Sequence, residues 1–259
     1  MLSARFAGCL LALALAGGSA AALAPSSASE LAVSRNLVLI DAKTGAVDTD
    51  FPDAYGGSGA YLVTADGRGG WYVGGDFTRV GDDSRKVLVH LRSDGSLDPN
   101  FKLAVPRRVF AAGNYLLSEL LFRGGVVYIA GDIGSHGELG VAALDSRTGE
   151  RLWWTRIKPW DSQINDLAFG GSVLYVSGPF TRVGDVSRTA IAALDPRTGK
   201  PTAWRIRLTY PSYMTIAAVG PVAVGGGKLF FYGDFARING VRGESGLAAI
   251  DLRTGSPIS

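Results

Sequence analysis

A segment of about fifty residues recurs along this chain, and this repeat constrains the fold more strongly than any other feature. Its first block occurs four times, as WYVGGDFTRVG (71–81), VYIAGDIGSHG (127–137), LYVSGPFTRVG (174–184) and FFYGDFARING (230–240). A second block ends each unit in a turn, and a fifth copy of it, LVLIDAKTGA (37–46), precedes the first complete unit. The turn glycines of the second blocks, Gly45, Gly95, Gly149, Gly199 and Gly255, are separated by 50, 54, 50 and 56 residues. Such a period indicates one small supersecondary unit built several times.

Each unit has the pattern of four short strands. Apolar residues alternate or form runs of four to seven, and helical spacing never persists for three turns. Gly-Gly turns such as 69–70 separate the first two strands, and turns of the Asp-x-x-Thr-Gly kind separate the last two. We therefore predict an all-β protein, a β-propeller of four-stranded antiparallel blades, with about four complete blades and a half blade. The expected spans are a half blade at 33–54 and blades at about 57–104, 113–158, 162–207 and 214–259.

Two positions in the first block carry a large side chain in every unit. The first position holds Tyr72, Tyr128, Tyr175 and Phe230, and the second holds Phe77, Ile133, Phe180 and Phe235. Large residues at equivalent places on every blade are what packing between blades requires. We therefore assign these side chains to the core rather than to an aromatic box for a ligand.

The isolated second block at the start of the repeat region predicts two outer strands of a shared blade. Propellers commonly close their ring with one blade built from both ends of the chain. Four blades and an unclosed half would leave strand edges open, which favours aggregation. We therefore expect this sequence to be the N-terminal part of a longer chain of seven or eight blades.

At this point a resemblance to known repeats can be stated. The segment WYVGGDFTRVGDDSRKVLVHLRSDGSLDPNF (71–101) resembles the delta-60 repeat, a bacterial β-propeller motif. The segments ALDSRTGERLWW (143–154) and ALDPRTGKPTAW (193–204) are similar to the docking motif of pyrroloquinoline-quinone-type propellers. Trp153 has the motif's spacing and Trp204 lies one residue late. The resemblance implies a β-propeller and, because such repeats occur in exported proteins, a protein outside the cytoplasm.

The N-terminus has the pattern of a secretory signal over residues 1–24. Arg5 is its only charge, an apolar run covers 6–16, and small residues follow up to Ala24. The apolar run is too short for a membrane span, which needs about 20 residues. We expect a cleaved signal, a linker at 25–32 and a secreted, periplasmic or cell-surface propeller at 33–259. The single cysteine, Cys9, would leave with the signal, so the mature chain would carry no thiol.

The charge and the hydropathy of the chain argue against two classes of partner, nucleic acid and the membrane interior. The formal net charge is +3 and only 19% of residues are charged, so a concentrated basic face for nucleic acid is not expected. No second apolar segment reaches membrane length, so we predict no membrane span. The sequence leaves the oligomeric state open.

The repeated polar residues are assigned to structure. Asp76, Asp132 and Asp234 share one position of the first block, which is Pro179 in the third unit. Arg85 and Arg242 follow two of these aspartates by nine and eight residues, which predicts a loop-bracing Asp–Arg pair or a backbone cap. No second acid stands beside them at ligand spacing, so no metal, catalytic residue or cofactor is predicted. Calcium at Asp82-Asp83 is left open.

Exposed positions that differ between blades are free to bind a ligand. The connections 102–114, 155–163 and 205–215 and the loops 78–86, 133–140 and 236–246 are expected to crowd one face. Side chains of the kinds that dominate interfaces occur there. The candidate binding residues are Arg107, Arg108, Phe110, His136, Trp160, Tyr210 and Tyr213.

These features predict an exported, non-enzymatic binding or interaction scaffold for an unknown protein or carbohydrate ligand. Two alternatives remain at this point: a quinone-dependent dehydrogenase and a cell-surface carbohydrate-binding module. The enzyme class would need a complete eight-bladed ring, a calcium site and, often, a disulfide of adjacent cysteines. The chain has no G-x-S-x-G elbow, HExxH, P-loop or dinucleotide fingerprint. The other histidine, His90, occupies a strand position filled elsewhere by alanine, and we expect it in the core or at an edge.

Overall fold

The computed structural model describes a chain that is built from β-strands. The described residues are 12–15, 38–41, 47–48, 52–55, 59–84, 87–103, 117–134, 138–159, 163–210, 219–242 and 246–258, the first three ranges by backbone alone. Every helix or strand within these ranges is a strand. The chain forms two compact units, Met1–Phe101 and Lys102–Ser259, which are described separately. A search of the described part of the chain for a helix long and apolar enough to cross a membrane finds none.

The first unit contains one blade and a short hairpin. Strands β5 (Gly59–Ala65), β6 (Trp71–Asp76) and β8 (Leu88–Leu91) pair antiparallel in that order, and a bridge from Leu91 to Leu97 begins a fourth strand. Before them, β2 (Val38–Asp41) and β3 (Val47–Asp48) form an antiparallel pair. Strand β1 (Ala12–Leu15), from the segment with the signal pattern, pairs parallel with β2.

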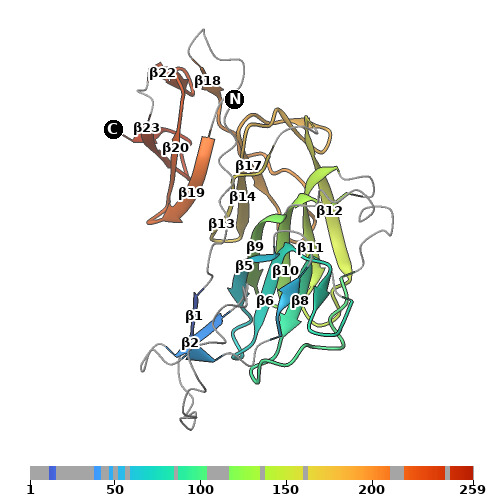
Figure 1. The fold of residues 1–259 in the computed structure, drawn as a ribbon. Coiled ribbons are helices and arrows are strands. Elements are labelled where there is room, and N and C mark those ends of the chain that lie inside the picture. Colours follow the sequence, from blue (N-terminus) through green and yellow to red (C-terminus); the bar gives the residue numbers. More distant parts are fainter. Residues whose placement is uncertain are drawn as a thin grey trace, which may run out of the picture. The chain divides into compact units, whose positions relative to one another are not determined.

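The second unit contains three antiparallel sheets of one kind (Figure 1). The first consists of β9 (Leu117–Arg123), β10 (Val126–Asp132), β11 (Leu139–Asp145) and β12 (Arg151–Lys158). The second consists of β13 (Asp166–Gly170), β14 (Val173–Ser177) and β17 (Ile191–Leu194), with a bridge from Leu194 to Pro201. The third consists of β19 (Val219–Gly225), β20 (Lys228–Gly233), β23 (Gly246–Asp251) and β24 (Pro257–Ile258). The first strands lie together, since β13 packs against both β9 and β19. The predicted fold class, an all-β propeller of antiparallel blades, is confirmed.

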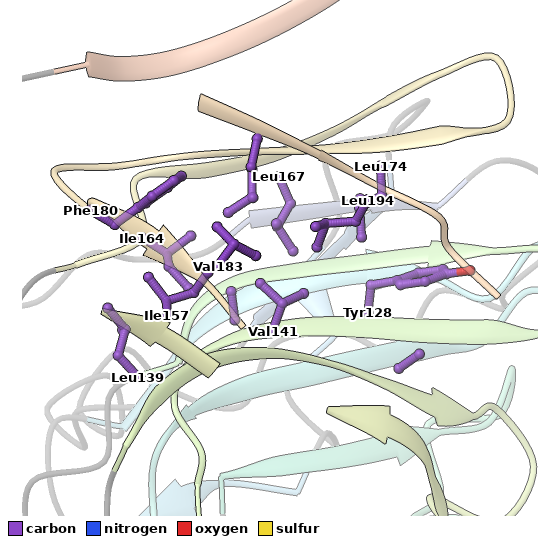
Figure 2. Close-up of a cluster of buried hydrophobic side chains, with 14 residues drawn as sticks. Tyr128, Leu139, Val141, Ile157, Ile164, Leu167, Leu174, Phe180, Val183 and Leu194 are labelled. Atoms are coloured by element: carbon purple, nitrogen blue, oxygen red, sulfur yellow. The ribbon is translucent and has the colours of Figure 1, made fainter. Parts of the chain in front are cut away.

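Consecutive sheets of the second unit bury apolar faces against each other. Between the first two sheets, Tyr128 and Val141 face Leu167, Leu174 and Leu194 (Figure 2). Each fully buried side chain of this size contributes ~1.5–3 kcal/mol relative to its exposed state. A similar cluster fills the space between the second and third sheets.

The large side chains shared by all units lie in the core, with one exception. Phe77, Ile133, Phe180 and Phe235 are buried, and so are Tyr72, Tyr128 and Tyr175. Phe230, their counterpart in the third sheet of the second unit, is only half-buried. It lies on the side of that sheet that faces away from the preceding blade.

Polar contacts join the first two sheets of the second unit as well. Trp153 donates its Nε1–H to the carbonyl of Pro196 at 2.9 Å, and the hydroxyl of Thr155 donates to the carbonyl of Gly199 at 2.8 Å. Trp204, the counterpart of Trp153 with one extra residue of spacing, packs beside Tyr175, but its buried Nε1 has no hydrogen-bond partner among the described residues. Trp153 therefore bonds to the turn of the next blade, and Trp204 makes no equivalent bond to a described residue.

The Asp-x-x-Thr-Gly turns fold as local, self-capped hairpins. Asp145 Oδ1 accepts the backbone N–H groups of Arg147 and Thr148, and Asp251 makes the same bonds to Arg253 and Thr254. These backbone bonds are the largest cause that lowers the pKa of the two carboxyls. The turn glycines Gly95, Gly149, Gly199 and Gly255 have φ of 81°, 77°, 70° and 72°, a region that favours glycine.

Candidate interaction face

Short strand pairs recur beside the blades, and we call them clasp hairpins. The chain segment that ends one unit pairs with the TRVG-like segment of the next unit. The three clasps are β4 (Ala54–Tyr55) with β7 (Arg79–Val80); β12 with β15 (Arg182–Val183) and β16 (Val186–Ser187); and β18 (Leu208–Thr209) with β21 (Arg237–Ile238) and β22 (Val241–Arg242). These hairpins fall in the loops 78–86 and 236–246 and in their counterpart at 181–188.

The clasps share one backbone geometry. The paired positions are Tyr55 with Arg79, Lys158 with Arg182 and Thr209 with Arg237. In each clasp a backbone N–H donates to the carbonyl of the first residue of the pair, from Thr78 at 2.9 Å, Thr181 at 2.8 Å and Ala236 at 2.7 Å. Identical pairing in three sequence repeats shows that the clasp belongs to the repeat and is not a feature of one loop.

The arginine of each clasp closes its own hairpin. Its guanidinium donates to a backbone carbonyl three residues later, which belongs to Asp82 at 2.9 Å, Asp185 at 2.7 Å and Gly240 at 3.0 Å. The arginines themselves, Arg79, Arg182 and Arg237, are exposed. They therefore set the shape of the tip and add a positive charge beside it.

A residue with positive φ starts each tip. Gly81 and Gly184 have φ of 54° and 56°, and Asn239 takes the same place with φ of 51°. Asparagine tolerates this conformation better than most residues. Its side chain also accepts the backbone N–H of Arg207 at 2.8 Å and donates to the carbonyl of Gly255. These bonds tie the hairpin to its neighbours in the same unit.

The tips differ in chemistry although their backbones agree. The first tip carries Asp82 and Asp83, the second Asp185 and Val186, and the third Gly240 and Val241. All six residues are exposed, with 39% of the Val186 surface and 55% of the Val241 surface accessible. A constant backbone with exposed, changing side chains is the arrangement that a repeat protein uses for recognition.

Most of the predicted binding residues lie outside the described residues. These are Arg107, Arg108, Phe110, His136, Trp160 and Tyr213, and the structural residues Arg85 and Gly45 lie outside them too. Tyr210 is described, and it is half-buried against the core between the second and third sheets. One side of its ring therefore packs between blades, and its part in a binding face stays a prediction.

The repeated aspartates have different surroundings. Asp132 is half-buried at the end of β10, and burial raises the pKa of its carboxyl. Burial and the nearby Asp76 raise the pKa of Tyr61 to about 12. In the part of the chain that the structure describes, Asp234 and Arg242 form no ion pair, and Arg242 lies exposed on β22. The expected Asp–Arg brace is therefore absent from this unit.

The first unit contains a polar cluster that its sequence pattern did not predict. His90 on β8 lies between two carboxylates, with Nδ1 2.9 Å from Asp98 Oδ2 and Nε2 3.1 Å from Asp66 Oδ2. Its ring stacks on Tyr72, with centroids 4.5 Å apart. All three polar side chains are largely buried. We expected His90 in the core or at an edge, but neither carboxylate was linked to it because they lie 24 and 8 residues away in the sequence.

The carboxylates of this cluster have lowered pKa values. Burial alone would raise the pKa of Asp66, but two backbone N–H groups and the His90 ring outweigh it. The pKa of Asp98 is lowered against burial by His90, by the backbone N–H of Asn100 and by the charge of Arg92. With both ring nitrogens engaged and little exposure, the cluster braces the blade and offers no open catalytic group.

A second pair of acids lies on the first strands of two neighbouring blades. Glu119 on β9 and Asp166 on β13 occupy equivalent positions, opposite Ala130 and Ser177. Burial, with the charge of Asp166 as a second cause, raises the pKa of Glu119 to about 7. Burial raises the pKa of Asp166 too, although its carboxylate accepts the backbone N–H of Val222 at 2.8 Å. Among the described residues, no group of three or more His, Cys, Asp or Glu could hold a metal ion.

Comparison with known proteins supports the fold. Residues 65–101 match the family described as "Domain of unknown function (DUF5122) beta-propeller". That segment covers most of the blade in the first unit and includes the whole His90 cluster. No curated protein matches the chain.

Two solved structures are similar to the chain. The computationally designed Ika4 protein is 13% identical, with a TM-score of 0.42, over 70% of this chain and 91% of that one. BamB from Moraxella catarrhalis is 16% identical, with a TM-score of 0.39, over 86% of this chain and 66% of that one.

Proposed function

We propose that this chain is an exported, non-enzymatic repeat protein that acts as a binding or interaction scaffold outside the cytoplasm. Its blades are proposed to be delta-60-type repeats with a relationship to pyrroloquinoline-quinone-type propellers. The bond from Trp153 to the turn carbonyl of Pro196 supports that relationship, because the residue with the motif's spacing makes the contact between blades.

The clasp hairpins carry this proposal. Their backbones are held in one geometry by strand pairing and by the arginine bond across each tip. Their tips are exposed and change from two acids, through one acid and a valine, to a glycine and a valine. By contrast, the His90 cluster of the first unit is largely buried and already bonded within the fold. The partner is therefore expected to contact the tips.

Photo-crosslinking from the tips tests the proposal. A photoreactive phenylalanine analogue would be placed at Val186 or Val241 in the chain produced by its native cells. The matched control is Leu152, which is as exposed as Val241, at 55%, but lies on β12 within a blade. We expect discrete cross-linked species from the two tip positions and none from the control. Equal products from all three positions, or products from Leu152 alone, would contradict the assignment.

A separate measurement tests the non-enzymatic part. Calorimetric titration of the purified chain with pyrroloquinoline quinone and calcium is expected to show no stoichiometric binding. Saturable binding at one quinone per chain would favour the dehydrogenase instead.

A further inference from the structure

We propose that the outer side of the sheet β19–β24 is a docking surface for a further blade of the same repeat type. We call this side the open face; it consists of Phe230, Tyr232, Leu247, Ala249 and Ile258. These five side chains lie on the same side of the sheet because they are cross-strand partners. Tyr232 lies opposite Leu247, Phe230 opposite Ala249, and Ala249 opposite Ile258. The proposal does not rest on the clasp tips and concerns a different surface.

The same face is buried on the two preceding blades of this unit. On the sheet β9–β12, the equivalent residues are Tyr128, Ala130, Val141, Ala143 and Trp153, and they form one side of the core shared with the next sheet. On the sheet β13–β17, the equivalent Tyr175, Ser177, Ile191 and Ala193 are buried against the sheet β19–β24. Each blade therefore uses this side to receive its successor.

On the open face the same positions are accessible. Leu247 is 77% exposed and Tyr232 is 61% exposed, and Ile258 in the place of Trp153 is exposed as well. Their neighbours on the opposite side of the same strands, such as Phe231 and Ile250, are buried. A contiguous apolar surface of this kind marks an interaction site. The residue types also match, because an aromatic residue at Phe230 and alanine at Ala249 repeat the pattern of the buried faces.

The known interfaces define the chemistry of the occupant. The side that covers Tyr128 and Val141 presents Leu167, Leu174 and Leu194, and the side that covers Tyr175 presents Leu229, Phe231 and Ile250. An incoming blade needs such an aliphatic face. It also needs room opposite Tyr232, which is larger than Ala130 or Ser177 at the same position. Continuity with these two interfaces therefore favours an antiparallel blade over a single strand or a helix.

A tandem extension supplies such a blade. Residues 204–259 would be appended directly after Ser259, because Pro257 pairs with Ile250 as Pro201 pairs with Leu194 and the repeat register is then kept. The only native thiol is removed by Cys9→Ser, and Leu247→Cys reports on the open face. The probe is Ellman's reagent, with Leu152→Cys as the control on another sheet.

We expect the Leu247→Cys thiol to react at least tenfold more slowly in the extended chain than in the original chain, and the control thiol to react equally in both. Leu229→Asp in the appended copy alone should restore the fast reaction. Equal rates for Leu247→Cys in both chains would overturn the proposal, even if the appended copy does not fold, because a repeat folds only against a neighbour that accepts it. Protection that grows with protein concentration in the original chain would overturn it in favour of a second copy as occupant.

Discussion

Trp153 donates its indole N–H to the carbonyl of Pro196 at 2.9 Å, and this bond joins the outer strand of one blade to the hairpin turn of the next. Tyr128 Oη also approaches the Pro196 carbonyl, at 3.4 Å. The turn at Pro196 therefore accepts hydrogen bonds from side chains of the preceding blade. The contact between these two blades contributes to the stability of both.

Replacing Trp153 by phenylalanine is expected to lower the free energy of unfolding by about 2 kcal/mol, since it removes both ring volume and a buried hydrogen bond. Trp204→Phe is the matched control, because it removes the same atoms but breaks no hydrogen bond to a described residue. Urea unfolding monitored by circular dichroism gives both values. Equal losses would show that the Pro196 bond contributes nothing.

Gly199→Ala is expected to destabilise the chain more than Gly255→Ala. Both glycines close equivalent turns with φ of 70° and 72°, so the backbone cost of about 1 kcal/mol is shared. A Cβ at Gly199 would meet the Trp153 ring and lie 2.6 Å from Thr155 Oγ1, whereas at Gly255 the nearest atom is Asn239 Nδ2 at 3.9 Å. Thermal melting of both variants compares them directly, and identical midpoints would contradict the tight contact.

The repeat period and its turn residues were sufficient to predict the blades. The 50-residue spacing located the four sheets, and the large residues at Phe77 and its counterparts predicted the core. These predictions succeed because strand alternation and turn geometry are local properties. The repeat pattern does not show whether one side of a given sheet is covered. Phe230 is an example, because its exposure depends on what packs against its side of the sheet.

The clasp and the His90 cluster show what the sequence pattern could not reveal. The recurring TRVG segment was visible, but its strand partner comes from the end of the preceding unit and has no fixed sequence: Tyr55, Lys158 and Thr209 pair through backbone atoms alone. His90 was visible only as a departure from alanine. Its partners, Asp66 and Asp98, lie in two turns that come next to β8 only in the folded chain.

Loss of a carboxylate beside His90 is expected to lower the stability of the folded chain more at neutral pH than in acid. The pKa of Asp98 lies below its ordinary value in the folded chain. Its stabilising contribution is therefore present above the unfolded pKa of about 3.9 and is lost as the pH falls through the folded value. Asp98→Asn should lower the free energy of unfolding by about 1–2 kcal/mol at pH 7, with a smaller difference at pH 3. A constant difference across this range in urea titrations would contradict the role of the charge.

Replacing Glu119 by glutamine is expected to stabilise the chain at alkaline pH. The folded pKa of Glu119 is raised to about 7, mainly by burial and further by Asp166. In the unfolded chain the carboxyl ionises near pH 4.3, so the folded state loses stability relative to it as the pH rises from about 4.3 to 7. An amide of the same shape does not ionise and avoids this loss. Glu119→Gln should therefore melt at a higher temperature than the parent at pH 8, with the gain disappearing near pH 4.

Glu150→Gln, at an exposed turn position, is the control and should show no such pH-dependent gain. A melting temperature for Glu119→Gln that stays at or below the parent's at pH 8 would mean that the carboxylate is well solvated between the two strands.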